Sequence, residues 1–94
     1  MAEMSLRDQI RAIEEMVQGL KKTCEYMDMM LDQMSEGIKG LRGEGFTMEK
    51  EEDYRERFFN PASAVVKEVT ENIRRYHVRY LEDVKDDLRS IWGA

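Results

Sequence analysis

The chain has 94 residues, of which 41% are hydrophobic and 37% are charged, and its net charge at pH 7 is −5. This composition is too apolar for a disordered chain and is typical of long helices that bury one stripe of side chains. It excludes nucleic acid as a ligand, because no basic stretch could neutralise several phosphates, and it excludes a membrane span, because the apolar runs are far shorter than the roughly 20 residues needed. A chain of this length forms one domain at most and buries a modest core, so we expect it to associate.

A heptad pattern predicts a first helix over about residues 5–41, with Ser5 as its cap. Apolar residues follow one another at alternating spacings of four and three along this whole segment. One set of seam positions is partly β-branched and comprises Ile10, Val17, Cys24, Leu31 and Ile38. The other set is rich in leucine and methionine and comprises Leu6, Ile13, Leu20, Met27, Met34 and Leu41. This distribution is typical of helices that pack side by side.

Four glycines between residues 37 and 45 predict a turn over about residues 42–47, because glycine tolerates left-handed backbone angles and ends helices. Leu41 and Phe46 flank Gly43 in this segment. These apolar side chains either close the end of the helix pair or stay exposed as a docking point. Thr47 is the expected cap of a short helix over about residues 48–59, whose first turns are acidic.

A second long helix is expected over about residues 61–92. Asn60-Pro61 predicts a break or kink before it, because proline lacks an amide donor and crowds the preceding turn. Its apolar stripe is expected at Ala62, Val66, Val69, Ile73, Tyr76, Tyr80, Val84, Leu88 and Ile91. Two arms of similar length predict an all-α antiparallel helical hairpin, which would cover the flanks of its stripes by dimerising into a four-helix bundle.

The titratable residues form no pattern typical of a catalytic, cofactor or metal site, so no catalytic residue, cofactor or metal is expected. His77 has no cysteine, histidine or carboxylate pair at a ligand spacing. Adjacent carboxylates such as Glu14 and Glu15 point in different directions on a helix. Cys24 lies in the seam, where a thiol behaves as a small apolar residue.

Binding to another protein is therefore the favoured class of function. Methionine suits surfaces that adapt to partners, and Met30 serves either a partner surface or packing within a homodimer. The candidate interaction residues are Leu20, Met27, Met30, Leu31 and Met34 on the first helix and Val69, Ile73, Tyr76 and Tyr80 on the second. Leu41, Gly43 and Phe46 form the candidate turn motif.

This layout resembles the W-x-G family of small helical hairpins exported by type VII secretion, and the related L-x-G domains of secreted toxins. Leu41-Arg42-Gly43 stands at the turn and matches the L-x-G form, and the aromatic-rich stretch from Tyr54 to Phe59 follows it. Exported members usually carry an acidic residue four positions after a tyrosine near the end of the second helix, whereas Tyr80 is followed at that spacing by Val84.

The resemblance implies a homodimer, or a heterodimer with a similar hairpin, and a role as a secreted partner, adaptor or targeting subunit for a larger effector. The N-terminal sequence lacks the features of a cleaved secretory signal. We therefore expect a cytoplasmic protein on synthesis, and any export to proceed without signal cleavage. The alternative is a cytosolic coiled-coil adaptor or chaperone-like subunit with no role in secretion.

Overall fold

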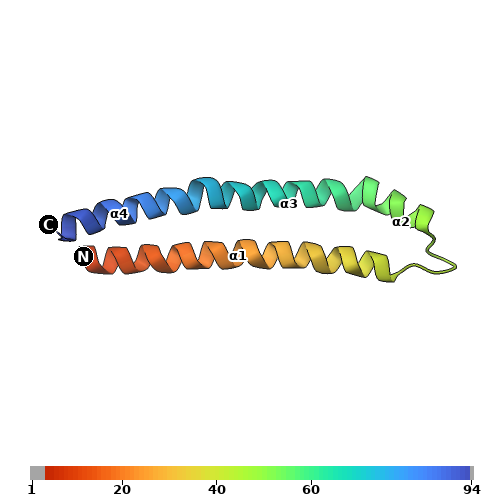
Figure 1. The fold of residues 1–94 in the computed structure, drawn as a ribbon, viewed down its shortest axis with the longest axis horizontal. Coiled ribbons are helices and arrows are strands. Elements are labelled where there is room, and N and C mark those ends of the chain that lie inside the picture. Colours follow the sequence, from red (N-terminus) through yellow and green to blue (C-terminus); the bar gives the residue numbers. More distant parts are fainter. Residues whose placement is uncertain (1–3, 94) are drawn as a thin grey trace. The chain divides into compact units, whose positions relative to one another are not determined.

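The computed structural model describes residues 4–93, which form helices and the turn that follows the first of them. The α-helices are α1 (Leu6–Gly40), α2 (Met48–Tyr54), α3 (Asn60–Asn72) and α4 (Arg79–Gly93), shown in chain order in Figure 1. Two short π-helical segments, Arg55–Phe59 and Ile73–Val78, join α2, α3 and α4 into one uninterrupted helical run. The described residues contain no strand and form two helical segments joined by one turn. The predicted all-α helical hairpin is therefore confirmed.

Both predicted helix caps are present. The backbone N–H of Asp8 donates to the Ser5 hydroxyl at 3.2 Å, and that of Lys50 donates to the Thr47 hydroxyl at 3.4 Å. Each bond satisfies an amide that the first turn of a helix leaves without an intrahelical partner. The two helix starts were therefore readable from the sequence.

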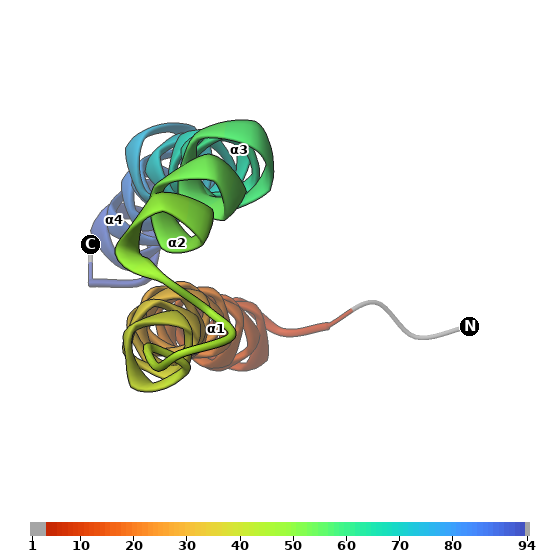
Figure 2. The same cartoon turned by 90° about the vertical axis from the view of Figure 1, so that its right-hand side faces the viewer.

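The turn between α1 and α2 is built differently from the prediction. None of the described glycines has a positive φ, so left-handed glycines do not make this turn. Instead the backbone N–H of Gly43 donates to the carbonyl of Phe46 at 3.0 Å and closes a short loop between the two helices (Figure 2). The described part of the chain therefore makes this turn without a left-handed residue.

Of the break or kink predicted at Asn60-Pro61, the break is wrong, because the helix continues and only widens just before the proline. The N–H of Asn60 donates to the carbonyl of Arg55, five residues back, which is the hydrogen bond of a π turn. In a regular α-helix the ring of Pro61 would crowd the carbonyl four residues back and offer it no hydrogen. The wider turn relieves this crowding, so the helical run continues from Met48 to Gly93.

The helices pack in two units. The terminal unit comprises residues 1–24 and 71–94, of which 4–24 and 71–93 are described, and the turn unit comprises residues 25–70. In the terminal unit the ion pairs Glu14–Arg89 and Lys21–Glu82 join segments that run in opposite directions. In the turn unit Leu31, Ile38 and Phe59 form the core, with Phe46 and Val66 packed against it.

Burial along α1 follows one of the two predicted seam sets. The buried set is the partly β-branched one: Ile10, Val17, Cys24, Leu31 and Ile38. The leucine- and methionine-rich set is half-buried from Leu6 to Met27 and exposed at Met34 and Leu41. The helix therefore buries one row of side chains and leaves the neighbouring row partly in water.

The predicted stripe of the second helix is wrong at five of its nine positions, where Ala62, Val69, Tyr76, Tyr80 and Ile91 are exposed. Its other members, Val66, Ile73, Val84 and Leu88, are half-buried. The residues that are buried along this run are Glu51, Phe59, Ser63, Thr70 and Val78. Within α3 the buried positions are polar Ser63 and Thr70, so a count of apolar residues selects Ala62 and Val69 instead. The π segment Ile73–Val78 then rotates the residues that follow it, so a count that assumes a uniform α-helix loses its phase there.

Replacing Leu31 by aspartate tests whether the buried row of α1 holds the turn unit together. Leu31→Asp removes a core side chain and introduces a charge there, so we expect the free energy of unfolding to fall by about 3 kcal/mol or more. Urea unfolding followed by circular dichroism measures the change. The control is Gln33→Asp, which adds the same charge at an exposed position of the same helix. Equal losses for the two variants would contradict the assignment of the core.

Candidate interaction surface

The two flanks of the terminal unit differ in chemistry. One of them, the charged flank, carries the ion pairs Glu14–Arg89 and Lys21–Glu82, the latter at 3.3 Å. A polar hollow on this flank is lined by Arg11, Glu14, Glu15, Gln18 and Lys85. Such groups are well solvated and offer little to an apolar partner.

The other side of the terminal unit, the apolar flank, has two hollows without an acidic residue, a lysine or an arginine. A groove of about 480 Å³ is lined by Met16, Gly19, Leu20, Thr23, His77, Tyr80 and Leu81. A second hollow is lined by Met4, Gln9, Ala12, Ile13, Val84 and Leu88. Exposed apolar surface that is continuous, and not scattered, is typical of interaction sites.

The groove brings together two of the residues predicted from the sequence. Leu20 is half-buried there and Tyr80 is 69% exposed, although both lie on its lining. Tyr76 is 60% exposed one turn before Tyr80, and Ile73 is half-buried. The sequence analysis did not identify Gly19, which lines the groove and, having no side chain, leaves space there.

The predicted interaction residues of the turn unit fall into two groups, one exposed at the surface and one buried in the core. Met30 and Met34 on α1 and Val69 on α3 are exposed, and Met27 is half-buried. Leu31 is buried in the core, so it supports the surface from beneath and cannot itself meet a partner.

The turn motif divides in the same way. Phe46 packs against the core of the turn unit and closes its end. Leu41 is 60% exposed, and Gly43 is exposed beside it. Phe46 therefore closes the end of the turn unit, whereas Leu41 remains exposed and docking at Leu41 stays a prediction.

A buried ionic cluster holds the turn against the helices. Glu51 on α2 is 3% exposed and accepts hydrogen bonds from Nε of Arg42 in the turn and, at 3.2 Å, from Nε of Arg55. Arg55 also donates to the hydroxyl and the carbonyl of Ser35 on α1, at 3.0 and 2.9 Å, and its guanidinium lies 5.5 Å from the centre of the Phe59 ring. The cluster therefore links the turn, the second helical run and α1.

The sequence alone did not identify Glu51, because it lies in an acidic segment that reads as solvated surface. The available signal was Arg55, four residues later, at the spacing of a helical ion pair. The hydrogen bond from Arg42 is the main cause that lowers the pKa of the Glu51 carboxyl, and burial opposes it. The hydrogen bond from Arg55 lowers that pKa further, so the carboxylate stays ionised at neutral pH.

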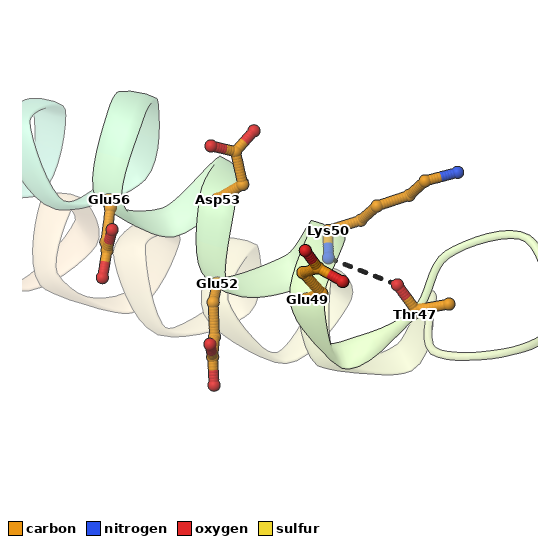
Figure 3. A pocket seen from close by; sticks show the side chains of 6 residues that line it. All are labelled: Thr47, Glu49, Lys50, Glu52, Asp53 and Glu56. Atoms are coloured by element: carbon orange, nitrogen blue, oxygen red, sulfur yellow. Dashed lines mark hydrogen bonds between the residues drawn. The ribbon is translucent and has the colours of Figure 1, made fainter.

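The acidic residues at the start of the second helical run do not form a metal site. Figure 3 shows the carboxylates of Glu52 and Asp53 pointing away from each other, while the N–H of Lys50 donates to Thr47. No group of histidine, cysteine and acidic residues within residues 4–93 is arranged to hold a metal ion. None of the helices in this part of the chain combines the length and apolar character needed to cross a membrane.

Glu51→Gln tests the ionic cluster, because it removes the charge and keeps the size of the side chain. Since the pKa of Glu51 is lower in the folded chain than in the unfolded one, the stabilisation is present above the ordinary carboxyl pKa and is lost as the pH falls through the lowered value. The wild-type chain should melt at a higher temperature than the variant at pH 7, and the difference should shrink below about pH 4.

The control for this measurement is Glu52→Gln, which removes a neighbouring exposed carboxylate. We expect it to melt close to the wild-type chain at every pH. A difference between Glu51→Gln and wild type that does not change with pH would contradict a role for the charge.

The chain matches no protein-family model, and no curated protein or solved structure matches it either. Its function is therefore inferred from its own surface.

Proposed function

We propose that the protein is a non-enzymatic interaction module of the type VII hairpin kind, which acts as a secreted partner or as a targeting or adaptor subunit for a larger effector. The observation that carries this proposal is the polarity of α3, which packs Val66 against the core but otherwise buries polar side chains and exposes apolar ones. Polar Ser63 and Thr70 are buried, whereas apolar Val65 and Val69 are 61% and 42% exposed. A helix that works alone buries its apolar side chains, so this arrangement favours a partner on the outer side.

Other exposed side chains support the same proposal. Large apolar groups are exposed in both units, with Met30, Met34, Tyr54 and Phe58 in the turn unit and Met16, Tyr76, Tyr80 and Ile91 in the terminal unit. Methionine and tyrosine are enriched at protein interfaces, because one adapts its shape and the other offers a rigid ring with a polar end. Charged residues are depleted from such surfaces, and they are absent from the linings of both apolar hollows.

The turn supplies a fixed apolar point for recognition. Leu41 is exposed beside Arg42, which is held by Glu51, and the loop is closed by the bond between Gly43 and Phe46. A loop that is already ordered loses little conformational entropy on binding. Leu41 and Gly43 are also the residues that match the L-x-G form, so we assign effector or secretion-partner recognition to this tip.

Leu41→Ala tests this assignment. Because the side chain is exposed, the free energy of unfolding should change by less than about 0.5 kcal/mol. A photoreactive residue at position 41 should cross-link to a specific protein in cells that produce the chain from its natural locus. A chain with the photoreactive residue at exposed Lys39 is the control and should give a weaker product. Equal labelling from both positions would contradict recognition by the turn.

Export is tested separately by comparing the culture medium with the cell fraction of the same cells. We expect the full-length chain in the medium, with its N-terminal residues intact, and a reduced amount for Leu41→Ala. Retention of the wild-type chain in the cells, together with specific cross-linking from position 41, would favour the cytosolic adaptor or chaperone-like subunit instead.

A further inference from the structure

We infer that Met27, Met30 and Met34 on α1 bind one Cu(I) ion through their thioether sulfur atoms. All three residues belong to the turn unit. The inference goes beyond the proposed function, because it concerns a metal ion and holds whether or not the chain has a protein partner. It also differs from the metal sites considered above, which use histidine, cysteine or carboxylate ligands.

Helical spacing places the three methionines on one face of α1. This helix is continuous from Leu6 to Gly40, and Met30 follows Met27 by three residues and precedes Met34 by four. At about 100° per residue, the three positions fall within about 60° of the helix surface. Residues at these spacings are neighbours, with Cβ atoms roughly 5–6 Å apart. Because the methionine side chain has three rotatable bonds, neighbouring sulfur atoms can approach a common ion.

The three side chains are accessible to an ion from solvent. Met30 and Met34 are 43% and 47% exposed, and Met27 is half-buried. Leu31, directly after Met30, is packed in the core of the turn unit and fixes the rotation of this part of α1. The backbone therefore holds the three ligand positions in place before an ion binds.

Neither helix formation nor packing accounts for methionine at these positions. The row of α1 that contains Met27 and Met34 has Leu20 before them and Leu41 after them. Leucine and methionine have similar helix propensities, and leucine packs with better-defined rotamers. The sulfur atom is therefore the property that distinguishes this part of the row from its leucine neighbours.

The ligand type selects the ion. A thioether is a soft, uncharged and polarizable ligand, and such ligands favour Cu(I). Oxygen ligands favour Mg²⁺ and Ca²⁺, and Zn²⁺ is bound by imidazole, thiolate or carboxylate groups. A site made of three methionines should therefore discriminate against these divalent ions.

The charge of the surrounding helix suits a cation. Uncharged ligands leave the positive charge of the ion in place, so nearby negative charge stabilises the bound state. Between Lys22 and Lys39 the sequence of α1 contains neither lysine nor arginine. The same stretch carries four acidic residues, which are Glu25, Asp28, Asp32 and Glu36.

The first test titrates the full chain, labelled with carbon-13 at its methionine methyl groups, with Ag(I). Ag(I) has the charge and ligand preference of Cu(I) and is stable in air. The methyl signals of Met27, Met30 and Met34 should shift and stop shifting at one equivalent. The signals of exposed Met29 and Met48 should not move. Cu(I), kept in solution as its acetonitrile complex without oxygen, should shift the same three signals, and Zn(II) should shift none of them.

The second test compares Met30→Leu with Met29→Leu, which removes an equally exposed methionine on a different face of the helix. Both variants keep an apolar helix former, so both should retain the circular dichroism of the wild-type chain. Met30→Leu should weaken Ag(I) binding by about tenfold or more, because one of three ligands is lost. Met29→Leu should bind Ag(I) as the wild-type chain does.

Cys24 provides the remaining control, because its thiol is also a soft ligand, although it is fully buried. Cys24→Ala should leave the three methyl shifts in place, and their loss in this variant would overturn the inference. A Met30→Leu chain that binds Ag(I) as tightly as Met29→Leu would also overturn it, as would shifts shared equally with Met29 and Met48. These results leave the proposed function standing, because recognition by the turn is measured from position 41.

Discussion

Two helices packed along one line each bury a single row of side chains and leave the adjacent rows partly in water. The protein meets this constraint on α1 by burying the set from Ile10 to Ile38 and leaving the set that includes Leu20, Met27 and Met34 at the edge. The main features of the surface follow from it. Apolar side chains that one pair of helices cannot enclose remain available, and the ion pairs of the terminal unit lie on the charged flank opposite the apolar hollows.

Three of the ten buried residues in the described part of the chain, Glu51, Ser63 and Thr70, are polar or charged. Ser63 and Thr70 occupy buried positions where larger apolar groups would stabilise more, and Thr70 donates its hydroxyl to the carbonyl of Lys67 at 3.0 Å. Glu51 is buried but receives hydrogen bonds from two arginines. Every buried side-chain nitrogen or oxygen in the described part of the chain has a hydrogen-bond partner. Because these polar groups are satisfied, burying them costs less free energy than burying groups without a hydrogen-bond partner.

The sequence was sufficient for the elements and insufficient for the faces of the second helix. The caps Ser5 and Thr47 marked the starts of α1 and α2 correctly, whereas the heptads of α1 predicted two seam sets, of which only the set from Ile10 to Ile38 is buried. The π segments before Pro61 and around Tyr76 could not be read from spacing, because they arise from backbone hydrogen bonds that local composition does not specify. Glu51 was missed because its arginine partners come from the turn and from the next helical turn, and an acidic segment by itself reads as surface.

We propose that this chain associates when it is concentrated, a claim that the concentration dependence of its melting temperature tests most directly. If only the folded chain associates, mass action raises the apparent stability as concentration increases. We predict that the midpoint measured by circular dichroism rises steadily as the purified chain is concentrated from the low micromolar to the high micromolar range. A midpoint that is high and constant over that range would show that the single chain is sufficient by itself and would contradict the claim.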